Sequence, residues 1–165
     1  MKKLLSLFFI LTISSILMAQ TGKVFDNLSM QSKLLKMDRK YAIYLPPDYE
    51  TSQRSYPVLY LLHGAGDDQT GWVQFGEVLN IADAAIKSGS ATPMIIVMPD
   101  ANTGKRGYVN DDDFLYEGNS LVHIAMRQKE IPHEFRIRDG AHNWTYWRAL
   151  LPKVLEFVSM GFHQF

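Results

Sequence analysis

Two stretches of almost uninterrupted apolar residues, Val58 to Leu62 and Pro93 to Asp100, constrain the fold more than any other feature. A strand that is apolar at consecutive positions is typical of a sheet covered on both faces. Between the two stretches, apolar residues recur at helical spacing from Val78 to Ile86, and Gly89 follows just past the expected end of that helix. The succession of strand, helix and strand indicates an α/β domain.

Another strand is predicted ahead of this unit, where the segment 39–50 alternates and then meets two prolines. The alternation indicates a half-buried strand, and the prolines end it. The apolar positions of this alternation are Tyr41, Ile43 and Leu45.

The second half of the chain predicts a helix, a strand and a helix. A helical pattern covers residues 118–129, with Asn119 or Ser120 as its cap, and Glu134 to Arg138 alternates as a strand does. Large apolar residues recur at helical spacing from Trp144 to Val158, and Pro152 within that pattern predicts a kink or a late helix start.

The first 19 residues have the pattern of a secretory signal peptide. Lys2 and Lys3 precede the apolar stretch Leu4 to Met18, and Ala19 is a small residue suited to cleavage. The alternative is a buried or membrane-anchoring helix, for which the stretch is short and wrongly flanked. We therefore expect a secreted or periplasmic protein whose single domain comprises residues 20–165.

Composition excludes several partners. The chain has no cysteine, so we expect no disulfide framework despite export. Its 17 basic and 17 acidic residues balance, which gives no reason to expect nucleic acid or, after signal cleavage, a membrane surface as a partner. We expect no cofactor, and the oligomeric state stays open.

The candidate site residues follow predicted strands. His63, Gly64, Ala65 and Gly66 come directly after the first apolar stretch, a place where backbone N–H groups can face a ligand. His142 lies between a predicted strand and a predicted helix, and Asp113 lies 29 residues before it. With one helix and one strand between them, an open parallel sheet brings these two loops to the same edge.

Other interpretations of these residues remain open. His142 can be an ordinary surface histidine, and the segment 111–113 can be a solvated acidic turn or a weak calcium site. A metal-dependent hydrolase using His63, His142 and the aspartates is a further alternative, although their spacing matches no compact ligand motif, so we expect no metal site. Trp72 can be an aromatic platform for a ligand or a core residue.

The chain resembles the esterase D-like branch of the α/β-hydrolases, which includes S-formylglutathione hydrolases and the feruloyl and acetylxylan esterases of carbohydrate esterase family 1. The segments that carry the resemblance are "RKYAIYLPPDYE", "YPVLYLLHGAGDDQTGW", "PMIIVMPD", "DDFLYEGN" and "HEFRIRDGAHNWTYWR". It implies His142 as the catalytic base, Asp113 as the acid with Asp112 as the alternative, and the loop at Gly64 and Ala65 as the oxyanion hole. The implied substrate is an ester of a small molecule or of a polysaccharide.

The nucleophile of this family is not found in the sequence. The family carries a serine in a G-x-S-x-G turn between the oxyanion loop and the acid, and no serine of this chain has that context. Ser120 comes nearest, with Gly118 two residues before it but Val122 two residues after it. It also follows Asp113, which is the wrong order.

Spacing leads to the same conclusion. Only 14 residues separate Met98 from Asp113, whereas a single βαβ unit takes roughly 30. We therefore predict a truncated α/β-hydrolase-like sheet with flanking helices, its central strands missing, and no serine-esterase activity in the chain as written. The alternative is a non-catalytic remnant or internally deleted gene product with at most a binding role.

Overall fold

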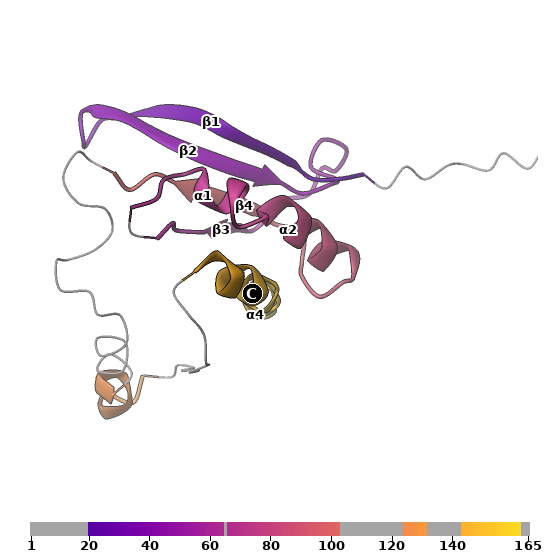
Figure 1. Cartoon of the computed structure of the whole chain (residues 1–165). Coiled ribbons are helices and arrows are strands. Elements are labelled where there is room, and N and C mark those ends of the chain that lie inside the picture. Colours follow the sequence, from indigo (N-terminus) through magenta and orange to yellow (C-terminus); the bar gives the residue numbers. More distant parts are fainter. Residues whose placement is uncertain (1–19, 65, 103–123, 132–142, 163–165) are drawn as a thin grey trace, which may run out of the picture.

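The computed structural model describes residues 20–64, 66–102, 124–131 and 143–162. Residues 20–64, 66–102 and 143–162 form a four-stranded sheet with helices packed against it (Figure 1). The elements are β1 (Lys23–Ser32), β2 (Met37–Leu45), β3 (Val58–Tyr60), α1 (Gly71–Gln74), α2 (Val78–Lys87), β4 (Ile95–Pro99) and α4 (Trp144–Phe162).

The sheet is mixed, and its strand order is β1-β2-β4-β3. β1 and β2 form an antiparallel hairpin, β2 and β4 are antiparallel, and β3 and β4 are parallel. This arrangement confirms the predicted α/β class. It also adds β1, which the sequence analysis missed because most of its side chains are exposed and pairing with β2 holds it.

The core lies on the face of the sheet toward α2 and α4. Ala42 is paired with Met98 and Tyr44 with Ile96, so these four side chains share one face, and all are buried. They pack with residues of the two helices, which are Val78, Ala82, Ala85, Leu151 and Leu155. β2 is therefore a strand as predicted. Its fully buried face is formed by Ala42 and Tyr44, whereas the predicted apolar positions Tyr41, Ile43 and Leu45 are half-buried.

β3 corrects the prediction that both faces of this stretch are covered. Leu59 and Leu61 pack against the core, whereas Val58 and Leu62 are exposed and Tyr60 is 66% exposed. The reason is position, because β3 is the edge strand in the part of the chain that the structure describes. β4 is the better-covered strand, since it pairs with a neighbour on each side.

The helices follow the sequence pattern closely. α2 ends at Lys87, and Gly89 adopts a left-handed φ of 75° just beyond it, as its position predicted. α4 runs through Pro152, so a late helix start is wrong. Residues 124–128 are helical, within the predicted 118–129, whereas the predicted strand from Glu134 to Arg138 lies outside the described residues.

α4 starts early because Asn143 caps it. The side-chain Oδ1 of Asn143 accepts the Tyr146 N–H at 3.0 Å, and its carbonyl accepts the Trp147 N–H at 3.1 Å. No helix within the described ranges is both long enough and apolar enough to cross a membrane.

The start of β1 is anchored to α2 by one carboxylate. Asp83 accepts the backbone N–H of Gly22 at 2.9 Å through Oδ2, and it accepts the hydroxyl of Tyr44 at 2.7 Å through Oδ1. The anchor leaves no room for a side chain at position 22, where a Cβ would collide with the Tyr44 ring. The described fold is thus secured within three residues of the expected cleavage site.

Candidate active site

The candidate site lies where β3 and β4 end. Because the two strands are parallel, their carboxyl ends meet at one edge of the sheet. Beyond that edge, the segment 61–70 leads from β3 to α1, and residues 100–102 follow β4. The Leu61 N–H donates to the Val97 carbonyl at 2.9 Å, so pairing with β4 continues to the residue at which the loop begins.

His63 fastens these two loops together. Its side chain is buried, and Nδ1 lies 2.7 Å from the Gly64 carbonyl. The Ala101 N–H donates to Nε2 at 3.0 Å, which makes Nε2 an acceptor and leaves the proton on Nδ1 as the donor. Asp100 lies beside the ring, with Oδ1 at 3.8 Å from Nε2. Both ring nitrogens are thus engaged, so His63 is a structural residue and a poor metal ligand.

A tight turn carries the chain from this loop into α1. Asp68 Oδ1 accepts both the Thr70 N–H and the Thr70 hydroxyl, each at 2.7 Å. The Thr70 N–H and then its hydroxyl hold the pKa of Asp68 below its ordinary value. Asn102, on the loop that follows β4, donates from Nδ2 to the Asp67 carbonyl at 2.9 Å. Hydrogen bonds therefore connect the two loops of the site.

Three tryptophans connect this loop to the start of α4. The ring of Trp144 makes edge contacts with Trp72 and Trp147, with ring centroids 5.1 and 4.8 Å apart. Trp72 also donates from Nε1 to the Leu62 carbonyl at 2.9 Å. Trp72 is therefore a packing residue between loop and helix, which favours the core interpretation over an aromatic platform.

Gly64 lies directly against this cluster. A Cβ added at Gly64 would meet Cη2 of Trp147 at 3.2 Å, so the indole covers the glycine closely. A second link is electrostatic: Arg148 donates from Nη1 to the Phe75 carbonyl at 2.9 Å, and its Nε lies 3.5 Å from Glu77. The described part of the predicted oxyanion loop therefore packs against the first turn of α4.

The structure describes only part of the predicted site. Gly64 lies in the described loop, whereas Ala65, Asp112, Asp113, Ser120 and His142 lie outside the described residues. Asn143, the residue that follows His142 in the chain, caps α4, and Trp147 in the first turn of α4 lies against Gly64.

Sequence reasoning missed the residues that hold the site together. Asp100, Ala101 and Asn102 follow an apolar stretch just as the His63 loop does, and that parallel could have singled them out. Trp144 and Trp147 are three residues apart and share a helix face, a spacing that could have indicated their joint packing. Within the ranges described, no group of three or more His, Cys, Asp or Glu side chains is placed to bind a metal ion.

Comparison with known proteins identifies the part of the chain that carries family features. Residues 32–114 match the Esterase family model, described as "Putative esterase". Esterase Rv1288 of Mycobacterium tuberculosis is 38% identical over 97 residues, which cover 57% of this chain and 20% of that protein. An endo-1,4-beta-xylanase/feruloyl esterase of Xylanibacter ruminicola is 42% identical over 60 residues, covering 34% of this chain and 8% of that protein. The chain thus spans a fifth or less of these relatives.

Solved structures agree on the fold. A ferulic acid esterase superposes with a TM-score of 0.75 at 23% identity, covering 85% of this chain and 98% of the other. S-formylglutathione hydrolase (FrmB) from Staphylococcus aureus superposes with a TM-score of 0.65 at 12% identity, covering 85% of this chain and 97% of the other. These likenesses confirm the α/β-hydrolase-like fold that the sequence predicted.

Proposed function

Since this chain belongs to the Esterase family, we propose that it is a secreted domain of the feruloyl and acetyl ester hydrolase type that lacks serine-dependent turnover as written. One observation carries the proposal. The described part of the loop at Gly64 is held by the hydrogen bond between Ala101 and His63 and by the Trp147 contact, although no serine of the sequence stands in a G-x-S-x-G turn. The chain keeps one half of a hydrolytic site and lacks the other.

The retained half has a defined chemical task. Backbone N–H groups of the loop at Gly64 and Ala65 would stabilise negative charge that develops on a carbonyl oxygen during acyl transfer. It is important that these groups are held in place, since preorganised donors require no rearrangement at the moment of reaction. The His63 bridge to Ala101 supplies that rigidity, because it ties the loop to the end of β4.

The acid and base of the proposal are Asp113 and His142, with Asp112 as the alternative acid. They follow the oxyanion loop in the order acid then base, which is the order of α/β-hydrolases. His142 can accept a proton and Asp113 can orient its ring, but neither replaces a serine hydroxyl within about 3 Å of the base. We propose that ester bonds are bound and not cleaved through an acyl-enzyme.

The test is turnover of methyl ferulate and of an aryl acetate, together with labelling by a fluorophosphonate. We expect no serine labelling and no turnover beyond that of a His142→Ala variant. Stoichiometric labelling of one serine, with turnover that His142→Ala abolishes, would overturn the proposal. Ser120→Ala is the matched variant, since Ser120 comes nearest to the elbow pattern.

A second candidate, a non-catalytic remnant with at most a binding role, has its own support. The exposed face of β3 at Val58 and Tyr60 is unusual for a strand of such apolar sequence. Ferulate titration followed by tryptophan fluorescence separates the two candidates, because all three tryptophans lie in the cluster at the site. Saturable quenching supports the first candidate, with its retained ester-binding site, and its absence supports a remnant that binds no ester. Resequencing the codons for Val109 to Asp113 tests for an internal deletion.

Export is part of the proposal. It is supported by the signal pattern of residues 1–19, in which two lysines precede an apolar stretch and a small residue. Sequencing the N-terminus of protein from a secreting host should find Gln20. A full-length chain embedded in the membrane would contradict export.

A further inference from the structure

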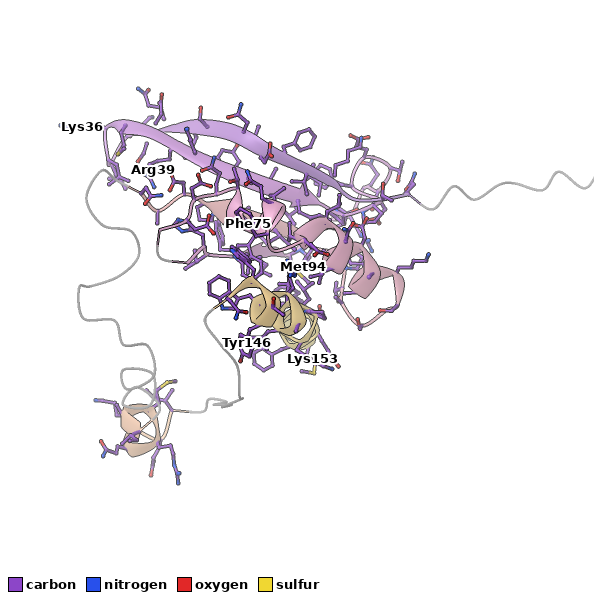
Figure 2. All side chains as sticks on the ribbon, in the orientation of Figure 1. Lys36, Arg39, Phe75, Met94, Tyr146 and Lys153 are labelled. Atoms are coloured by element: carbon purple, nitrogen blue, oxygen red, sulfur yellow. The ribbon has the colours of Figure 1, made fainter. Side chains whose placement is uncertain are left out.

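The turn that joins β1 and β2 projects apolar side chains into water. Pairing ends at Ser32 and Met37, and the four residues between them form the tip of the hairpin. Leu34 is 94% exposed and Leu35 is 54% exposed. Figure 2 shows Lys36 at the outer end of the hairpin, away from the helices. The tip is therefore a small apolar surface without a covering partner in the described structure.

The tip is held in shape. The Leu35 N–H donates to Ser32 Oγ at 3.1 Å, and Lys36 adopts a left-handed φ of 52°. Met30, on β1 of the same hairpin, is also exposed. Adjacent exposed apolar side chains on a projecting element, such as Leu34 and Leu35, are typical of an interaction site.

Charge at the hairpin end is strongly one-sided. The segment 28–40 carries four basic residues, Lys33, Lys36, Arg39 and Lys40, and a single acidic one, Asp38. This excess of three positive charges stands in a chain whose total is balanced. Apolar side chains flanked by lysines fit a partner that is negatively charged at its surface and apolar just below it.

We propose that the tip Lys33 to Lys36 docks on a lipid bilayer with anionic headgroups. Leu34 and Leu35 enter the interface, and the two lysines face the phosphates. A second copy of the chain is a poorer occupant, because it presents the same positive charge and two tips would repel each other. The balanced charge of the whole chain predicted no membrane contact after signal cleavage. We depart from that prediction because the positive charge is concentrated at the hairpin.

Docking there would orient the candidate active site. β2 is antiparallel to β4, so the start of β2 lies beyond the carboxyl end of β4, where Tyr41 pairs with Pro99. Arg39 reinforces this by donating to the carbonyls of Asp100 and Asn102. The hairpin tip and the oxyanion loop consequently lie at the same edge of the sheet, and a docked tip would bring that edge toward the bilayer.

The experiment is vesicle co-sedimentation of the chain 20–165, which lacks the apolar leader. Vesicles of phosphatidylglycerol and phosphatidylcholine are compared with vesicles of phosphatidylcholine alone. We expect reversible binding to the anionic vesicles only, and at least tenfold weaker binding, as an order-of-magnitude estimate, for Leu34→Ser/Leu35→Ser and for Lys33→Gln/Lys36→Gln. Phe157→Ser and Lys153→Gln are matched controls, since both residues are exposed on α4, and they should bind like the wild type.

The variants at the tip should keep the far-UV circular dichroism and the Tm of the wild type, because the substituted side chains pack against little. Equal binding to both vesicle types, unchanged binding of the tip variants, or no binding at millimolar lipid would each overturn the proposal. Concentration-dependent dimerisation that Leu34→Ser/Leu35→Ser abolishes, without lipid binding, would assign the tip to a second copy instead. None of these outcomes depends on whether the chain cleaves esters.

Discussion

Replacing Tyr44 by phenylalanine tests the anchor between β1, β2 and α2. The Tyr44 ring is fully buried in the core, and its hydroxyl donates to Asp83 at 2.7 Å. Tyr44→Phe removes this hydrogen bond and leaves the ring in place. A hydrogen bond to a charged acceptor contributes about 1.5–3 kcal/mol. Asp83 keeps the N–H of Gly22 as a donor, so we expect the low end, a loss of about 1.5 kcal/mol at neutral pH.

The difference should shrink and reverse in alkali. Burial first, and then the hydrogen bond and charge of Asp83, raise the pKa of Tyr44 above its ordinary value of 10.0. The unfolded chain therefore releases the Tyr44 proton near pH 10, whereas the folded chain keeps it. Stability that depends on the neutral hydroxyl is fully present below pH 10 and falls by about 1.4 kcal/mol per pH unit above it. The phenylalanine variant has no such loss, so the two stability curves should cross near pH 11.

The assay is urea unfolding followed by circular dichroism at pH 7, 10, 11 and 11.5, for the wild type and for Tyr44→Phe. Tyr60→Phe is the matched control, since Tyr60 is 66% exposed. It should follow the wild-type curve at every pH. Parallel curves for the wild type and Tyr44→Phe up to pH 11.5 would refute the argument, because they would mean that Tyr44 ionises within the folded chain.

Three further substitutions probe the loop between β3 and α1. Gly64→Ala places a Cβ at 3.2 Å from the Trp147 indole, so we expect a loss of about 1 kcal/mol and altered tryptophan emission. Gln69 is 6% exposed and its Oε1 has no hydrogen-bond partner in the described structure, so Gln69→Met should raise stability by about 1 kcal/mol in urea unfolding. For Asp68→Asn we expect lower stability at pH 7 and a gap that closes below about pH 4, because hydrogen bonds from Thr70 lower the pKa of Asp68 and its contribution is lost as the carboxylate protonates.

The spacing of apolar residues was enough to predict the elements whose side chains pack against the core. α2 and β4 lie where their apolar spacing predicted, because each packs one or both faces against the same core. β1 escaped prediction since its exposed side chains give no periodic signal, and its stability comes from backbone pairing with β2. The burial of β3 was overestimated for a related reason, because a run of apolar residues does not reveal whether a strand lies at the centre or the edge of a sheet.

The candidate site was predictable as a position and not as a set of contacts. The turn at His63 and Gly64 follows an apolar strand, and sequence order alone indicated a backbone site there. The role of the His63 ring was hidden, because its partner, the N–H of Ala101, is 38 residues away in the chain. The covering of Gly64 by Trp147 likewise joins residues that only the packing of α4 brings together.

Only 14 residues separate Met98 from the predicted acid Asp113, yet the described residues on the two sides of this interval are packed together. α4 follows that interval, and Leu151 and Leu155 on it share the core with β2, α2 and β4. The Trp147 ring, in the first turn of α4, lies against Gly64 in the predicted oxyanion loop. Aromatic packing therefore holds the first turn of α4 against the described part of this loop. The deficit that we propose for the site is accordingly chemical, namely the absence of a positioned hydroxyl nucleophile.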